Sequence, residues 1–350
     1  GLFMIFTIIE FIRDTSKTSN IIFFIEDRSH LRFSVNLIQY FLKHNFFIKV
    51  LCLENPFDKE RIDSKIEIIQ LQNNIEKIKY LKNLTGSLFF TTTPSIGTSI
   101  FPKSQVQPID KRPKYIYLFH SLVSPNEMYI KNSFKNFDYI FSPSKIISHQ
   151  LNGLVSNHTK IFETGYLLFD EIDVFKFSNN KNNKILLAPT WGDGVKEISK
   201  DINKIYQFAI LNNLSLVFRP HPMTDIKSLK LNSEIIIDKS KNLDNLNEYS
   251  ILITDFSGIA LEYFYLTGRP VIFLDVVKKV KRKLKNKEKD LNLIENSMRN
   301  ILGKVLKIDE LIYFDIRKIE TDTESKKFIE SLNYNKSSLN RTVEIIKTLT

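Results

Sequence analysis

The stretch ILITDFSGIALEYFYLTGRPVIFLD, from Ile251 to Asp275, holds the most informative pattern in this chain. Residues 251–254 form a short apolar run that predicts a buried strand, and residues 271–274 form a second one. Between them lie the polar turn Asp-Phe-Ser-Gly and an apolar helix-like segment that Gly-Arg-Pro ends. The stretch therefore predicts one βαβ unit of a parallel sheet.

The turn at the start of the predicted helix is suited to a phosphate group. The first N–H groups of a helix have no intrahelical partner, and the helix dipole is positive there. Ligands of parallel sheets also bind outside the carboxyl ends of the strands. We therefore expect Asp255, Ser257 and Gly258 to bind phosphates, with an ordinary helix cap as the alternative. Glu262, five residues after Ser257, could reach a ribose hydroxyl or be a solvated helix residue.

Strand-like and helix-like runs alternate along the rest of the chain, which predicts an α/β fold with parallel, doubly wound sheets. The predicted strands are 20–26, 48–53, 88–91, 115–119, 139–142, 160–164, 185–188, 214–218 and 234–237. The predicted helices are 31–43, 72–81, 145–151 and 199–211.

The polar stretch FSNNKNNK at 177–184 interrupts this alternation and predicts a hinge near residue 175. A length of 350 residues favours two domains. We expect an N-terminal α/β domain at 1–175, a C-terminal α/β domain at 176–325, and a helix at 326–350 that packs back onto the first domain.

Composition and charge exclude several classes. The formal charge of +11 could suit an anionic partner, but no signature of a nucleic-acid-binding module accompanies it, so we expect no nucleic-acid partner. The one cysteine, Cys52, lies in an apolar run and excludes a disulfide framework. Residues 1–12 are apolar but shorter than the ~20 residues of a membrane span, and they lack the features of a secretory signal. We expect a cytoplasmic protein.

The run KKVKRKLKNKEK at 278–289 holds eight basic residues and one glutamate. It predicts a basic amphipathic helix that could bind anionic lipid or an anionic polymer, or else a solvated surface helix. The first interpretation would place the protein peripherally on the inner face of the cell membrane. The contact residues would be Lys278, Lys279, Lys281, Arg282, Lys283 and Lys285.

Polar groups follow three further predicted strands, in LFHS at 118–121, LAPTWGD at 187–193 and VFRPHP at 217–222. In a protein of two α/β domains, all of these strand ends could face one central cleft together with the turn after residue 254. The chain lacks GxGxxG, Walker A, HExxH, GxSxG and DxD motifs, so a dehydrogenase, P-loop NTPase, zinc protease or serine hydrolase is not expected.

These strand ends supply the remaining candidate site residues. Arg219 has a planar fork that matches phosphate oxygens, and His221 is a titratable group on a backbone stiffened by prolines. His120 could act as a general base or be an ordinary loop histidine. Thr190 and Trp191 could line the site, although a core position would suit Trp191 equally well. Cationic side chains and the helix dipole can neutralise phosphates, so we expect neither a metal nor a cofactor.

With these residues in view, the chain resembles the CDP-glycerol glycerophosphotransferase family, the bacterial primases and polymerases of teichoic-acid and capsule polymers. The motifs that carry the resemblance are TGYLLFD at 164–170, LLAPTWGDG at 186–194, RPHP at 219–222 and ILITDFSGIALEYFYLTGRPVIF at 251–273. The resemblance covers residues 110–275. It implies a GT-B fold, in which two Rossmann-like domains with parallel sheets face a central cleft.

The resemblance also implies a reaction: transfer of glycerol phosphate, or a related polyol phosphate, from a CDP-activated donor to a hydroxyl of a cell-envelope polymer or its primer, with release of CMP. It makes His120 the base for the acceptor hydroxyl, and it places His221 on the donor pyrophosphate. The turn at 255–258 would hold the donor phosphates, and Glu262 would contact the ribose or nucleotide. The family motif Trp-His-Gly, followed by a lysine, is replaced here by Phe119-His120-Ser121, so the acceptor side differs.

Two alternatives stay open from the sequence. One is a GT-B glycosyltransferase that uses a UDP- or CMP-sugar in capsule or lipopolysaccharide synthesis. The other is a non-catalytic nucleotide-binding subunit of such an assembly. The expected partners are a nucleotide-activated donor, a polysaccharide or lipid-linked acceptor and an anionic membrane surface.

Overall fold

The structure is a computed structural model that describes residues 21–58, 62–72, 74–98, 100, 111–171, 183–240, 244–278, 293–319, 323–332 and 337–349. Contacts divide the chain into two compact units. The first unit comprises residues up to His120, Tyr129–Glu171 and residues from Leu332 onward. The second comprises Ser121–Met128 and Ile172–Ser331, so the chain enters the second unit briefly and returns before residue 129.

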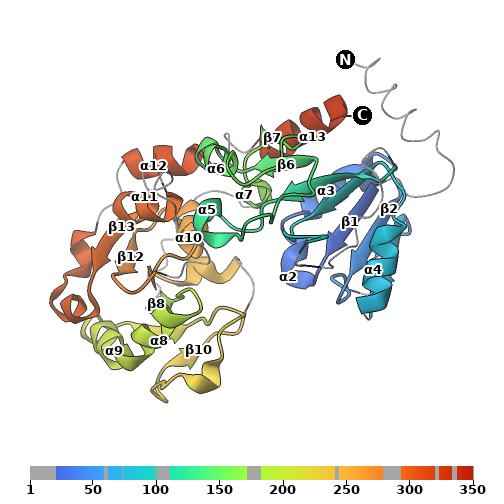
Figure 1. The fold of residues 1–350 in the computed structure, drawn as a ribbon. Coiled ribbons are helices and arrows are strands. Elements are labelled where there is room, and N and C mark those ends of the chain that lie inside the picture. Colours follow the sequence, from blue (N-terminus) through green and yellow to red (C-terminus); the bar gives the residue numbers. More distant parts are fainter. Residues whose placement is uncertain are drawn as a thin grey trace. The chain divides into compact units, whose positions relative to one another are not determined.

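The first unit is built on a seven-stranded, wholly parallel sheet (Figure 1) with the order β3-β2-β1-β4-β5-β6-β7. Its strands are β1 (Ile21–Ile25), β2 (Ile48–Cys52), β3 (Ile66–Gln70), β4 (Leu88–Thr91), β5 (Lys114–Leu118), β6 (Tyr139–Ser142) and β7 (Lys160–Glu163). The chain builds outward from β1 to β3 and then restarts beside β1 with β4. The switch point of this sheet, where ligands of such folds bind, therefore lies between β1 and β4.

The helices of the first unit are α2 (Arg28–Leu31), α3 (Val35–Lys43), α4 (Asn74–Lys82), α6 (Lys145–Leu151), α7 (Leu167–Glu171) and α13 (Ser338–Leu349). Phe41 of α3 and Ile346 of α13 pack into one apolar cluster with the strand residue Phe23. The carboxylate of Asp170 accepts the N–H groups of Ser338 and Leu339 at 3.3 and 2.5 Å. Since these are the first residues of α13, the carboxylate caps the helix and fixes it to this unit.

The second unit is built on a six-stranded, wholly parallel sheet with the order β10-β9-β8-β11-β12-β13. Its strands are β8 (Lys184–Leu187), β9 (Ser215–Phe218), β10 (Ile236–Ile237), β11 (Ile251–Thr254), β12 (Val271–Leu274) and β13 (Gly303–Leu306). The switch point here lies between β8 and β11. A Cβ on Gly303 would lie 1.8 Å from the carbonyl oxygen of Val271, so β13 pairs at this register only with glycine at that position.

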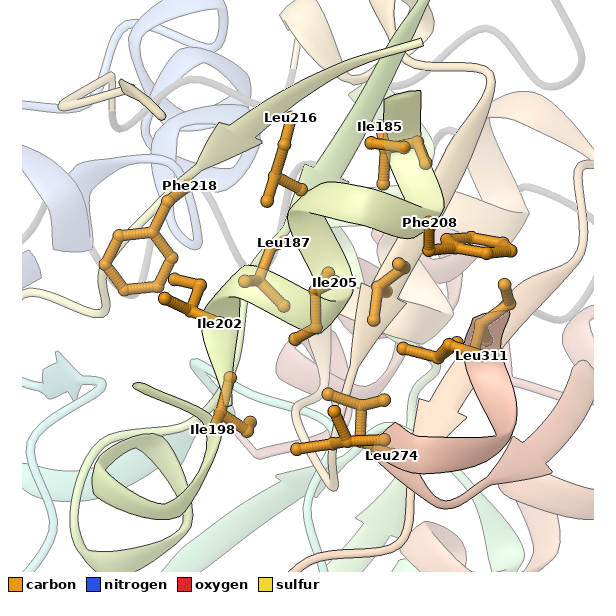
Figure 2. Close-up of a cluster of buried hydrophobic side chains, with 14 of the residues drawn as sticks. Ile185, Leu187, Ile198, Ile202, Ile205, Phe208, Leu216, Phe218, Leu274 and Leu311 are labelled. Atoms are coloured by element: carbon orange, nitrogen blue, oxygen red, sulfur yellow. The ribbon is translucent and has the colours of Figure 1, made fainter. Parts of the chain in front are cut away.

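The α-helices of the second unit are α5 (Pro125–Met128), α8 (Asp193–Lys200), α9 (Ile202–Leu211), α10 (Ile259–Thr267), α11 (Ile294–Ile301) and α12 (Thr323–Glu330). Short 3₁₀ helices occupy η2 (Ile226–Ser228), η3 (Asp244–Glu248), η5 (Ile308–Tyr313) and η6 (Ile316–Lys318). Figure 2 shows the apolar core in which α8 and α9 meet the strands, with Ile198, Ile202, Ile205, Phe208, Leu187, Leu216 and Phe218. α10 is buried at residues 260–267 and ends at Gly268, whose φ of 64° suits a left-handed cap.

The structure confirms the predicted α/β class with parallel sheets, and the βαβ unit at 251–275 is β11, α10 and β12. It also differs from the predictions. The single helix predicted at 199–211 is two helices that break at Asp201, and the short strands β3 and β13 were not predicted. α12 contacts α10 and α11 of the second unit, and Ser325 Oγ donates to Ile301 O at 2.6 Å, whereas α13 packs on the first unit.

Three predicted features lie wholly or mostly outside the described residues: the apolar segment 1–12, the polar stretch 177–184 and the basic run 278–289. Within the described part of the chain, no helix is both long and apolar enough to cross a membrane.

Candidate active site

A carboxylate and a threonine join the two strands at the switch point of the second unit. Asp255 follows β11, and its Oδ1 accepts the backbone N–H of Thr190 at 2.9 Å. The hydroxyl of Thr190 donates to the other oxygen of the same carboxylate. Beneath this pair, Thr254 Oγ1 donates to Ala188 O at 2.6 Å. Asp255 is fully buried, and its carboxylate links the loops that follow β8 and β11.

Ser257 and Gly258 form the start of α10. Gly258 is the N-cap residue, and the N–H of Ile259 lies 3.5 Å from Ser257 Oγ. A Cβ on Gly258 would lie 3.4 Å from Leu122 O, which is at the near limit of ordinary van der Waals contact. Ser257 Oγ therefore lies beside the first N–H of α10, and this position is compatible with an anion at the same helix end.

Arg299 is a site residue that sequence reasoning missed. Its guanidinium donates to Asp255 O and Leu274 O, both at 3.1 Å, and lies 3.9 Å from the ring centre of Phe256. Burial lowers the pKa of Arg299, and the carboxylates of Asp275 and Asp255 oppose that shift. The side chain therefore fixes the carbonyl ends of β11 and β12. In the sequence it stands in an amphipathic helix and is indistinguishable from a solvated arginine.

Arg219 follows β9 and pairs with a carboxylate of its own unit. Its Nε and Nη2 donate to Asp238 Oδ2 at 3.0 and 2.7 Å, and Nη2 also lies 2.7 Å from Asn245 Oδ1. Tyr249 Oη donates to the same Asp238 oxygen at 2.9 Å, and the N–H of Ser240 donates to Oδ1 at 2.7 Å. Burial would raise the pKa of Asp238, but these hydrogen bonds outweigh it and hold the value at about 2. The pair ties the start of the RPHP turn to the segment that follows β10.

His221 lies beside Trp191, at 6.2 Å between ring centroids with a tilt of 33°. Nδ1 of His221 accepts the backbone N–H of Met223 at 3.1 Å. Because Nδ1 is the acceptor in this contact, the neutral imidazole carries its proton on Nε2. The structure therefore brings the predicted site residues Trp191 and His221 together, and Nε2–H of His221 can donate a hydrogen bond.

The structure places two other predicted residues in buried surroundings. Glu262 is only 9% exposed, so the interpretation as a solvated helix residue is wrong. Lys278 makes an ion pair with Glu127 and lies 4.0 Å from Glu295, with its side chain 17% exposed. Ser124 N donates to Glu295 Oε1 at 2.7 Å, so this charge cluster ties the segment 121–128 to its unit. The other predicted basic residues, Lys279, Lys281, Arg282, Lys283 and Lys285, lie outside the described residues.

His120 stands at the carboxyl end of β5 in the first unit. Its Nδ1 lies 3.2 Å from the hydroxyl of Tyr117, which lies 3.1 Å from the hydroxyl of Tyr129. Burial, and then the neighbouring Tyr129, raise the pKa of Tyr117 well above its ordinary value, so this hydroxyl keeps its proton at neutral pH. The Tyr117 hydroxyl can give that proton to Tyr129 and accept one from His120 Nδ1. In that arrangement Nε2 of His120 carries a lone pair that can accept a proton.

Across the described residues, no group of three or more His, Cys, Asp or Glu side chains is arranged to hold a metal ion.

A family model described as CDP-glycerol:poly(glycerophosphate) glycerophosphotransferase matches residues 121–324. No curated protein matches the sequence.

Several solved structures are similar in fold. A variant of the wall teichoic acid polymerase TagF soaked with CDPG superposes with a TM-score of 0.56 at 15% identity, covering 99% of this chain and 96% of that one. A structure named as a putative UDP-N-acetylglucosamine 2-epimerase from Listeria monocytogenes gives a TM-score of 0.57 at 14% identity, covering 95% of this chain and 96% of that one. The UDP-GlcNAc 2-epimerase of Neisseria meningitidis bound to UDP-GlcNAc gives 0.55 at 14% identity, covering 94% and 99%.

At these identities the similarity shows the fold alone, and it agrees with the predicted GT-B class. The family model is a separate finding, and it matches more than half of the sequence. The chain therefore belongs to the CDP-glycerol:poly(glycerophosphate) glycerophosphotransferase family.

Proposed function

We propose that this enzyme transfers glycerol phosphate from CDP-glycerol to a hydroxyl of a cell-surface polymer or its primer and releases CMP. The observation that carries the proposal is the turn between β11 and α10, which Asp255, Thr190 and Arg299 hold rigidly in a member of this family. A helix N-terminus fixed at a switch point is suited to the diphosphate of a nucleotide-linked donor.

Three groups of the second unit serve the donor in this proposal. The start of α10 at Ser257 and Gly258 faces the phosphates with its dipole, and Nε2–H of His221 donates to a phosphate oxygen. Trp191, beside His221, lines the same site, and Glu262 contacts the ribose. Arg219 supports His221 indirectly, because its guanidinium fork is committed to Asp238.

The first unit supplies the base. His120 accepts the proton of the acceptor hydroxyl on Nε2 while Tyr117 holds Nδ1. The acceptor oxygen attacks the phosphorus that bears the glycerol, and a new P–O bond forms as the bond between that phosphorus and the bridging oxygen to CMP breaks. The negative charge that builds on the departing CMP is stabilised by the His221 N–H and the helix dipole.

Ligand-dependent melting tests the donor class. The panel comprises CDP-glycerol, CDP-ribitol, CMP, CDP, UDP-sugars and CMP-sugars. A ligand at about 100 times its Kd stabilises a protein by ~2.7 kcal/mol, which a thermal-shift assay detects. We expect the CDP-polyols and CMP to raise the melting temperature and CDP-glycerol to yield CMP when an acceptor is present.

The panel also separates the alternatives. A shift with UDP- or CMP-sugars alone, followed by a new glycosidic bond, would move the reaction to glycosyl transfer. Donor binding without CMP release in the presence of teichoic-acid primers would favour a non-catalytic subunit. His221→Ala and the exposed-histidine variant His149→Ala form a matched pair, since only the first is expected to weaken donor binding.

A further inference from the structure

The switch point of the first unit carries a polar cluster that the proposed reaction has not used. Glu26 follows β1, Thr92 and Thr93 follow β4, and His30 lies on α2. These residues come from the two neighbouring strands at which the sheet order reverses. Ligands of parallel sheets bind at such positions, so the cluster stands where an acceptor-side group is needed.

The cluster is tied together by side-chain contacts. Thr93 Oγ1 donates to Glu26 Oε1 at 2.5 Å, which joins the ends of β1 and β4. His30 Nδ1 lies 3.4 Å from Thr92 Oγ1 and 4.0 Å from Glu26 Oε1. The side chains of His30 and Glu26 are 22% and 33% exposed, so both are held in place and still reach solvent.

Local structure explains why His30 is placed here. The carboxylate of Asp27 accepts the N–H of Ser29 at 2.7 Å and caps the short helix α2. This cap turns the chain immediately after β1 and brings His30 back over the carboxyl end of the sheet.

The ring of His30 lies against the ring of His120. Their centroids are 5.6 Å apart and the planes differ by 27°, which is a stacked arrangement. Phe33 and Tyr129 meet His120 edge-on at 6.2 and 6.4 Å. His120 is therefore stacked on His30, lies near two roughly perpendicular aromatic rings, and is held at Nδ1 by Tyr117.

We propose that His30 is a positioning residue: held by Thr92 and Glu26, it stacks on His120 and keeps the Nε2 edge of that imidazole in line with the acceptor hydroxyl. This rests on the proposed function, which makes His120 the base. His30 acts on His120 through the face of its ring, because its Nδ1 is directed to Thr92 and Glu26.

The test compares His30→Ala, His30→Phe and the exposed control His149→Ala in the full chain. Without the His30 ring, the His120 imidazole can rotate away from its position. Misplacement of a catalytic group by about 1 Å costs up to ~10²-fold in rate, so we expect His30→Ala to lower kcat by about 10- to 100-fold. The KM for CDP-glycerol should stay unchanged, because the donor groups belong to the second unit. His30→Phe keeps a flat ring on His120 and should recover most of kcat.

Three results would overturn the proposal: kcat of His30→Ala within about twofold of the wild type, a higher donor KM at unchanged kcat, or His30→Phe as slow as His30→Ala. A substrate-free measurement separates this idea from the proposed function. ¹⁵N NMR of the imidazoles should show altered His120 ring signals in His30→Ala and unaltered ones in His149→Ala. If the wild type releases no CMP from any CDP-polyol, the function fails, and the NMR comparison still decides whether His30 orients His120.

Discussion

Replacing Asp238 with asparagine separates two roles for Arg219. The sequence suggests that Arg219 binds phosphate, whereas its guanidinium is paired with Asp238 at 2.7 and 3.0 Å. The Asp238→Asn variant keeps the shape of the side chain and removes its charge. If the pair is structural, the variant should be less stable than the wild type. If Arg219 instead binds phosphate, loss of the Asp238 charge should leave its guanidinium more available and tighten donor binding.

The size of the stability effect follows from the pKa of Asp238. Its ordinary value of 3.8 falls to about 2 in the folded protein. One pKa unit corresponds to 1.36 kcal/mol, so the charged form contributes about 2 kcal/mol to the free energy of unfolding. Because the folded pKa is the lower one, this stability is present above about pH 4 and is lost as the pH falls toward about 2. The Asp238→Asn variant should lose this contribution to the free energy of unfolding at neutral pH. At low pH, where Asp238 is protonated, the variant should be about as stable as the wild type.

Trp191 makes the measurement specific to one unit. It is the single tryptophan of the chain and lies in the second unit with Asp238, so urea unfolding followed by its fluorescence reports that unit. We expect a lower urea midpoint at pH 7 and a difference from the wild type that shrinks in acid. Asp315→Asn is the control, since it breaks an ion pair with Arg317, whose side chain is 85% exposed, and such pairs contribute little. An unchanged midpoint together with tighter CDP-glycerol binding would refute the structural role.

Three further predictions follow from the site and the sheets. His221→Ala should lower turnover by ~10²- to 10³-fold, as loss of one preorganised donor does, with an unchanged circular dichroism spectrum; near-wild-type activity would contradict this. Tyr117→Phe should lower kcat by about tenfold through misplacement of His120. The pH–rate profile should stay in place, because burial raises the pKa of Tyr117 well above its ordinary value and the hydroxyl does not titrate in the assay range. Gly303→Ala should prevent normal folding, because its Cβ would meet Val271 O at 1.8 Å, whereas Gly153→Ala, with open space around it, should melt like the wild type.

Much of the second sheet could be predicted because its strands are short apolar runs in a parallel sheet that is buried on both faces. The stretch from Ile251 to Asp275 is the best example, with a glycine at the left-handed helix end. The strands that were missed differ in this respect. β3 has only half-buried and exposed residues at the sheet edge, and β13 begins with Gly303 and exposes Lys304.

The sequence indicated which residues are candidates for the site but not which of them contact one another. A turn such as 255–258 can be recognised from its own residues and from the apolar runs on either side of it. The partners of that turn do not, because Thr190 lies 65 residues before Asp255 and Arg299 lies 44 residues after it. The partner of Arg219 could not be predicted for the same reason, since nothing in the RPHP motif indicates that Asp238 stands opposite.

The discontinuous course of the first unit affects how the protein is made. Its apolar cluster includes Val343 and Ile346 from α13 as well as Phe23 from β1, so that core is complete only after residue 346 has left the ribosome. The pieces of the second unit, 121–128 and 172–331, have all emerged by then. The unit whose synthesis begins first thus cannot complete its core until the second unit has emerged, and a nascent chain that stops before α13 leaves part of that apolar core uncovered.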